Sequence, residues 1–223
     1  MEVFKIFINF KTYPQGTGEK AVELAKICEG FGGDGKFEII PVVQAADLYR
    51  IKQSVKIPVW VQHTDWQKQG QHTGWQNLEA VVEAGASGTL LNHSEHPLSP
   101  GTIKQVLARV KEAKRQKNKD FEVMVCCKTL GQMERLAKLK PGYLGYEIEE
   151  LIGKEVSIVD FDIKALEHAK EICKEIPLII GAGVHKPGDL KKAKELGCGG
   201  VLISSAIVLA ENPKEKLAEI VNF

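Results

Sequence analysis

The feature that most constrains the fold is a regular alternation of short apolar runs with helical patterns along all 223 residues. Apolar runs of four to eight residues are typical of buried strands, and apolar residues three or four apart are typical of helices that cover them. The predicted strands are Val3–Asn9, Phe37–Val43, Pro58–Gln62, Thr89–Asn92, Phe121–Cys127, Tyr143–Glu147, Leu178–Gly181 and Val201–Ser204. The predicted helices are Glu19–Glu29, Ala45–Val55, Asn77–Ala84, Pro100–Lys117, Gly131–Leu139, Asp162–Glu175, Pro187–Leu196 and Pro213–Val221.

These eight strand-then-helix units follow one another without a linker, which predicts a single domain over residues 1–223. Strands that are separated by helices pair in parallel, and their continuous apolar character indicates burial on both faces. Eight such units fit a closed (β/α)₈ barrel. An open flavodoxin-like or Rossmann sheet is the alternative, and it is weakened because no GxGxxG motif follows the first strand.

Charge and composition exclude several classes of protein. The formal net charge is +1, from 30 basic and 29 acidic residues, which argues against a nucleic-acid binder. No stretch approaches the roughly 18 apolar residues that span a bilayer, and no signal peptide is seen, so we expect no membrane partner. Without CxxC spacing, neither a disulfide framework nor a zinc site is predicted, and we expect a reducing, cytoplasmic location. The five cysteines are Cys28, Cys126, Cys127, Cys173 and Cys198.

Polar residues follow several of the predicted strands directly. Lys11, His93 and Glu147 each lie just after such a run or at its end. Because the carboxyl ends of the strands of a parallel barrel meet at one mouth, we expect the three side chains to converge. A lysine, a histidine and a glutamate in one place make an acid/base site with a fixed positive charge, which suits proton transfer on a small anionic carbonyl compound. Taken singly, each residue has a simpler interpretation. Lys11 could be a surface lysine, His93 a loop histidine beside a helix cap, and Glu147 a member of an acidic turn.

The order of these motifs resembles one known family. The motifs are Asn9-Phe10-Lys11, Gln71-His72-Thr73-Gly74, Thr89-Leu90-Leu91-Asn92-His93-Ser94-Glu95, Tyr146-Glu147 with Glu150-Leu151-Ile152-Gly153, Gly181-Ala182-Gly183 and Gly200-Val201-Leu202. The chain resembles triosephosphate isomerase in the short form typical of archaea, over nearly its whole length. The segment from Asn92 to Glu95 is the most specific part of the match. The resemblance implies a TIM barrel, a role in glycolysis and gluconeogenesis, and a triose phosphate substrate.

The resemblance also assigns roles to the residues at the mouth. It implies interconversion of dihydroxyacetone phosphate and D-glyceraldehyde 3-phosphate through an enediolate. Glu147 would move the proton between adjacent carbons, and His93 would polarise the carbonyl oxygen, kept neutral by a helical turn that follows it. Lys11 would supply positive charge, Asn9 would hold Lys11 and the substrate, and Glu95 would brace the site. No metal and no organic cofactor is implied.

A lid and a phosphate site are implied at two further places. Ile152 and Gly153 would lie in a flexible lid after the sixth strand, which keeps water from the enediolate. Gly183, Ser204 and Ser205 would present backbone N–H groups to the substrate phosphate.

The polar loop from Gln62 to Gln76 is the segment by which the family would assemble. Thr73 in this loop would reach a neighbouring subunit, which implies a homodimer or a homotetramer. Exposed tryptophans among Trp60, Trp66 and Trp75 would favour a subunit interface. The alternative is an ordinary exposed loop.

The chain departs from the family pattern at five positions. Lys154 and Glu155 follow the lid glycine, Ile148 replaces a proline after the glutamate, and His185 and Ala206 alter the two phosphate loops. We expect these changes to act on lid mechanics, phosphate affinity and turnover, with Lys154 or His185 as a compensating positive charge. Two alternatives follow: a barrel isomerase that acts on a related sugar phosphate, or a catalytically idle relative.

Overall fold

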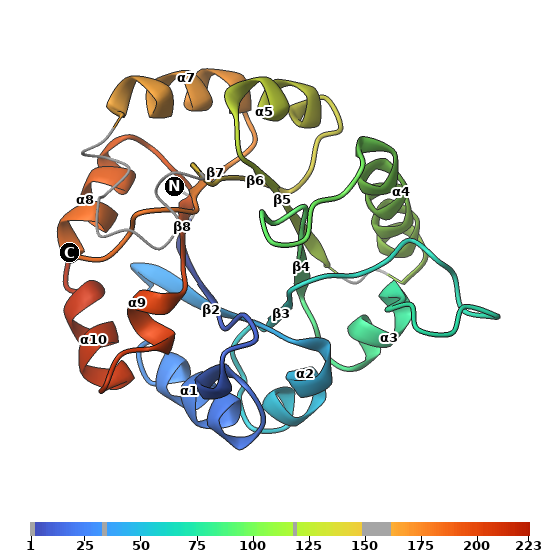
Figure 1. The fold of residues 1–223 in the computed structure, drawn as a ribbon, viewed down its shortest axis with the longest axis horizontal. Coiled ribbons are helices and arrows are strands. Elements are labelled where there is room, and N and C mark those ends of the chain that lie inside the picture. The colour runs from blue at the N-terminus through green and yellow to red at the C-terminus, as the bar shows by residue number, and fades with distance from the viewer. Residues whose placement is uncertain (1–2, 33–34, 118–119, 149–161) are drawn as a thin grey trace.

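The computed structural model describes residues 3–32, 35–117, 120–148 and 162–223, and its architecture is a closed barrel of parallel strands inside a ring of helices (Figure 1). Each strand pairs with the next one in the chain, and the last pairs with the first, which confirms the predicted (β/α)₈ barrel. The strands are β1 (Phe4–Asn9), β2 (Phe37–Val43), β3 (Trp60–Val61), β4 (Gly88–Leu91), β5 (Glu122–Cys127), β6 (Tyr143–Tyr146), β7 (Leu178–Ile180) and β8 (Gly200–Ile203).

Closure depends on a close approach between β1 and β8. Lys5 lies opposite Gly200 in this parallel pair, and Ile8 lies opposite Ile203. A Cβ atom at Gly200 would lie 2.1 Å from the Lys5 carbonyl oxygen, so only glycine fits at this point of the seam. Because every strand runs in the same direction, the residues that follow the strands all gather at one end of the barrel.

The helices lie outside the barrel and shield its outer surface (Figure 1). Their bounds agree with the predicted ranges to within a few residues. The strand β3 spans Trp60–Val61 rather than the predicted Pro58–Gln62, and Pro58 at its predicted start has no N–H to donate to a ladder. The sequence analysis missed two short elements, η1 (Pro14–Gly16) and α9 (Ser205–Val208). The others are α1 (Glu19–Glu29), α2 (Ala45–Lys52), α3 (Leu78–Glu83), α4 (Pro100–Lys117), α5 (Leu130–Ala137), α7 (Ile163–Cys173), α8 (Pro187–Glu195) and α10 (Pro213–Ile220).

The apolar core has two layers, because successive side chains of a strand point to opposite faces. Ile6 and Ile8 of β1 belong to the outer layer between barrel and helices, and Phe7 lies in the barrel interior. Inside the barrel, Phe7 packs edge-on against Trp60 with ring centroids 4.7 Å apart, and Trp60 packs against Tyr143 at 5.7 Å. This aromatic group fills the barrel interior and gives the site above it a rigid floor.

The five cysteines are buried free thiols. Burial raises the pKa of Cys28 to about 12 and that of Cys198 to about 11, so both stay protonated at neutral pH. Within the described ranges, no helix combines the length and the apolar character needed to cross a membrane.

The packing of Trp60 predicts a stability defect. In Gly88→Ala, the new Cβ would lie 2.3 Å from the indole Cε2, and a rigid ring held between Phe7 and Tyr143 has no room to move. We expect a loss of about 1–3 kcal/mol in the free energy of unfolding, measured by urea denaturation. The matched control Gly101→Ala, whose Cβ would lie 3.6 Å from its nearest neighbour, should unfold at an equal or higher urea concentration. An unchanged midpoint for Gly88→Ala would contradict this packing.

Candidate active site

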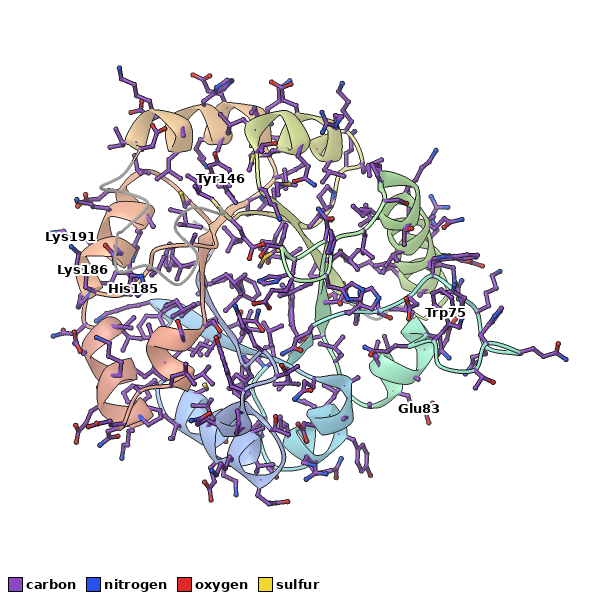
Figure 2. The ribbon with its side chains drawn as sticks, in the orientation of Figure 1. Trp75, Glu83, Tyr146, His185, Lys186 and Lys191 are labelled. Atoms are coloured by element: carbon purple, nitrogen blue, oxygen red, sulfur yellow. The ribbon has the colours of Figure 1, made fainter. Side chains whose placement is uncertain are left out.

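Glu147 lies directly after β6 and is almost fully buried, with 2% of its surface exposed. Tyr146, the residue before it, points outward between the barrel and helices α5 and α7 (Figure 2), so strand alternation turns Glu147 towards the mouth. Space for the carboxylate comes from Gly181 on the neighbouring strand end. A Cβ at Gly181 would lie 2.7 Å from Glu147 Cγ.

His93 is aimed at Glu147 by an unusual turn at the end of β4. Asn92 has a φ of +58°, a left-handed conformation that only glycine adopts freely. Its side chain holds the turn in place: Nδ2 donates to the Cys126 carbonyl at 2.7 Å, and Oδ1 accepts from Leu98 N–H at 2.8 Å. The result is a distance of 2.8 Å between His93 Nε2 and Glu147 Oε1.

The tautomer of His93 follows from its two neighbours. Glu95 N–H donates to His93 Nδ1 at 3.3 Å, so Nδ1 is an acceptor and the ring proton lies on Nε2, facing the Glu147 carboxylate. The sequence analysis expected a helical turn after His93, and residues 93–96 do form a single turn, closed by His96 N–H on the His93 carbonyl at 2.8 Å. The long helix α4 begins only at Pro100. The effect of the turn on the His93 ring stays a prediction.

Lys11 also occupies a left-handed turn, with a φ of +48°. Two side chains hold this turn: Asn9 Oδ1 accepts from Lys11 N–H at 3.0 Å, and Gln62 Nε2 donates to the Lys11 carbonyl at 2.8 Å. The Lys11 ammonium donates to Glu95 Oε1 at 2.7 Å. Asn9 and Glu95 therefore position Lys11, while Gln62 is a positioning residue that sequence reasoning missed.

Cys126 is a second residue that sequence reasoning missed. It lies in the barrel interior and is fully buried, and the charge of the Glu147 carboxylate acts on its thiol. Burial, and after it the negative charge of Glu147, raises the pKa of the Cys126 thiol well above its ordinary value. The alternation along β5 puts Cys126 on the same interior face as Met124, which was the available signal.

One cavity joins the acid/base residues to the two last strand ends. The cavity has the predicted acid/base residues on one side and the ends of β7 and β8 on the other. Gly183, with a φ of +64°, needs the freedom of glycine there. Ile152, Gly153, Lys154 and Glu155 of the predicted lid lie outside the described residues. The predicted residues that line this cavity are Asn9, Lys11, His93, Glu147, Gly183, Ser204 and Ser205, and the two departures His185 and Ala206 line it as well.

Thr73 does not reach this cavity within one chain. It is exposed in the loop between β3 and α3, which projects away from the ring (Figure 1). Trp66 and Trp75 of this loop are 37% and 51% exposed, and Figure 2 shows Trp75 on the outer side of the ring. Trp60, in contrast, is buried inside the barrel and belongs to the core.

The predicted acid/base residues meet at the carboxyl end of the barrel. A buried carboxylate, an imidazole and an ammonium group share one mouth, which has room on its far side for an anion. In the described part of the chain, no group of three or more His, Cys, Asp or Glu side chains is placed to hold a metal ion. Fold and site together define a barrel isomerase that shifts protons on a small carbonyl compound.

Comparison with known proteins narrows this class to one family. The family model of triosephosphate isomerase matches residues 4–141, and that of the thiazole biosynthesis protein ThiG matches residues 152–222. The triosephosphate isomerase of Methanobrevibacter smithii is 34% identical over 97% of both chains. That of Methanocaldococcus jannaschii is 35% identical over 98% of this chain and 99% of its own, and that of Methanobacterium bryantii is 37% identical over 97% and 95%. The chain belongs to the triosephosphate isomerase family, and it is an aldose–ketose isomerase.

The contact between Gly181 and Glu147 predicts an activity defect. In Gly181→Ala, the new Cβ would meet Glu147 Cγ at 2.7 Å and displace the carboxylate. Because a shift of about 1 Å in a reacting group lowers the rate by roughly 10²-fold, we expect kcat to fall by about that factor. Steady-state kinetics beside a circular dichroism melt checks this. Gly131→Ala, which lies on α5 with its nearest neighbour 4.0 Å away, is the control. Full activity in Gly181→Ala would show that the carboxylate has free space.

Proposed function

We propose that the protein interconverts dihydroxyacetone phosphate and D-glyceraldehyde 3-phosphate, with Glu147 as the base. The observation that carries this proposal is the 2.8 Å contact between Glu147 Oε1 and His93 Nε2 in a mouth that also holds Lys11. A carboxylate suits the reaction because it can accept a proton from one carbon and return it to the next. Assembly of all three residues argues against a catalytically idle relative.

The steps follow from which atoms face the mouth. Glu147 removes a proton from the carbon next to the carbonyl, and the electron pair moves into an enediolate. His93 Nε2–H donates to the substrate oxygen on which negative charge develops. The His93 Nε2–H group that donates to Glu147 in this structure is therefore the group that donates to the substrate once the substrate is bound. His93 gives its Nε2 proton to that substrate oxygen and takes the proton of the neighbouring hydroxyl, so the negative charge moves to the other oxygen of the enediolate. Protonated Glu147 then returns its proton to the carbon that held the original carbonyl, a carbonyl forms at the neighbouring carbon, and the ring and the carboxylate end as they began.

Lys11 provides the fixed charge of the site. Its ammonium lies on the same cavity as His93 and Glu147, where it stabilises both the enediolate and the phosphate dianion. Asn9 holds the Lys11 backbone by accepting its N–H, and Glu95 accepts from its ammonium at 2.7 Å. Glu95 also fixes the His93 tautomer through its backbone N–H, so it braces two of the three reactive groups.

The phosphate and the lid complete the proposed site. Gly183, Ser204 and Ser205 line the far side of the cavity, where they suit a phosphate group bound by backbone N–H donors. For Ile152 and Gly153, the proposed role in a closing lid rests on the family pattern alone. A lid would keep water from the enediolate, which otherwise loses phosphate.

We further propose that the chain assembles as a homodimer, or as a homotetramer built from such dimers. Residues 68–75 are exposed without interruption, and a second cavity of about 460 Å³ lies beside the first. This second cavity is lined by Lys11, Gln62, Glu95 and others, so a loop that filled it would brace the catalytic lysine. Docking of the partner's loop there would also cover the exposed Trp66 and Trp75. Five free thiols support a cytoplasmic location.

The role of Glu147 is tested by Glu147→Gln in a coupled assay of glyceraldehyde 3-phosphate conversion. Gln keeps the shape of the side chain but cannot accept the proton, so we expect kcat to fall by about 10²–10⁴-fold with the melting temperature retained. Glu134→Gln, an exposed glutamate on α5, should keep full activity. A Gln variant that turns over at the unmutated rate would remove Glu147 from the mechanism.

The proposed interface is tested by Thr73→Arg. An arginine brought into a cavity that holds Lys11 would meet like charge, so sedimentation should show dissociation towards monomers. Because the loop braces the cavity wall, kcat should fall together with the assembled fraction. Glu167→Arg places the same side chain on the exposed face of α7, and it should sediment like the unmutated protein. If Thr73→Arg stays assembled, this loop does not form the interface.

A further inference from the structure

The hydroxyl of Ser204 is a polar group that the structure leaves without a partner at the edge of the active site. Ser204 is the first residue after β8, and it lines the same cavity as Lys11 and Glu147. Its Oγ atom is buried and has no hydrogen-bond partner among the described residues. A buried hydroxyl in that state destabilises a fold, so its presence needs a reason.

Helix capping does not provide that reason. Ser204 occupies the residue before α9, where a serine side chain ordinarily accepts a backbone N–H from the first turn. The Ser204 side chain makes no such bond. Other helices of this chain show the ordinary behaviour, because the side chains at their N-caps each accept from a backbone N–H three residues on. These residues are Asn77, Thr129, Asp162 and Asn212.

The other buried unpartnered atoms of the described residues have local explanations or lie elsewhere. Glu79 and Arg109 form an ion pair with each other, which leaves one atom of each without a bond. Asp189 uses its second carboxylate oxygen to accept from His185 N–H at 2.8 Å. Gln67 lies outside the residues that line the cavity. Within the described ranges, Ser204 is thus the one unpartnered group that lines the active-site cavity.

We propose that Ser204 Oγ donates a hydrogen bond to a phosphate oxygen of the substrate. The proposal rests on the proposed function, and it adds a side-chain donor to the backbone donors of that site. A hydroxyl that donates to a dianion makes a short, charge-assisted bond, and the ligand would supply the acceptor that the protein lacks. Gly183, which lines the same cavity without a side chain, leaves space for the phosphate group, and Lys11 balances its charge.

Two consequences separate this role from a structural one. First, Ser204 should favour phosphorylated over unphosphorylated substrate, because its bond is made only to the phosphate group. Second, removal of the hydroxyl should stabilise the free protein and lower the stability that ligand binding adds. A residue that merely packs would change both states in the same direction.

The binding experiment compares Ser204→Ala with the unmutated protein, with inorganic phosphate as the probe. We expect an equal or higher melting temperature without ligand, a smaller rise on adding phosphate, and a dissociation constant roughly tenfold weaker by calorimetry. Ser54→Ala removes an exposed hydroxyl at the end of α2 and is the control. Equal phosphate affinity in Ser204→Ala would overturn the proposal, as would the absence of phosphate binding by the unmutated protein.

The kinetic experiment compares two substrates. For glyceraldehyde 3-phosphate, kcat/KM of Ser204→Ala should fall about tenfold, while the slow isomerisation of unphosphorylated D-glyceraldehyde should be unchanged. Ser204→Thr, which keeps the hydroxyl, should restore part of the loss. An equal fall for both substrates would overturn the proposal. Should the unmutated protein fail to isomerise either substrate, the proposed function fails, and the phosphate titration still decides the role of Ser204.

Discussion

The site is organised around the buried carboxylate of Glu147. A carboxylate with 2% of its surface exposed is costly to hold in its charged form unless donors surround it. The chain supplies two donors from the end of β4, His93 Nε2–H at 2.8 Å and Ser94 N–H at 3.3 Å. Gly181 leaves room for the carboxylate on another side. A substrate that replaced His93 would therefore leave Ser94 N–H still donating to the carboxylate.

Two strained turns make this arrangement possible. Lys11 and Asn92 both have left-handed backbones, which are unfavourable by about 1–2 kcal/mol for residues other than glycine. The Lys11 turn is fixed by the side chains of Asn9 and Gln62. The Asn92 side chain fixes its own turn through the Cys126 carbonyl on β5 and Leu98 N–H in the segment before α4. The strain is therefore supported by the most stable part of the fold, and it directs a lysine and a histidine into the mouth rather than along the surface.

The alternation of apolar runs was sufficient to predict the barrel, because burial on both faces and parallel pairing leave few other architectures. Side chains at strand ends were predictable for the same reason: Lys11, His93 and Glu147 had to meet. What the sequence could not show was how they are held. The tautomer of His93 depends on one N–H direction at Glu95, and the position of Lys11 depends on Gln62, which lies 51 residues away. Such contacts follow from φ angles and strand register, which no local pattern encodes.

Two residues at which this chain departs from the family pattern lie on one side of the active-site cavity. His185 and Ala206 line the end of the cavity near β7 and β8, whereas the donors to Glu147 come from the end of β4. A change in the predicted phosphate loops can alter the affinity for phosphate without moving Glu147. The loop residues and the residues that hold Glu147 follow different strands of a rigid barrel. Gly181 is the exception, since it begins the β7 loop and touches Glu147 directly. It is the position at which variation in the phosphate loops would reach the chemistry.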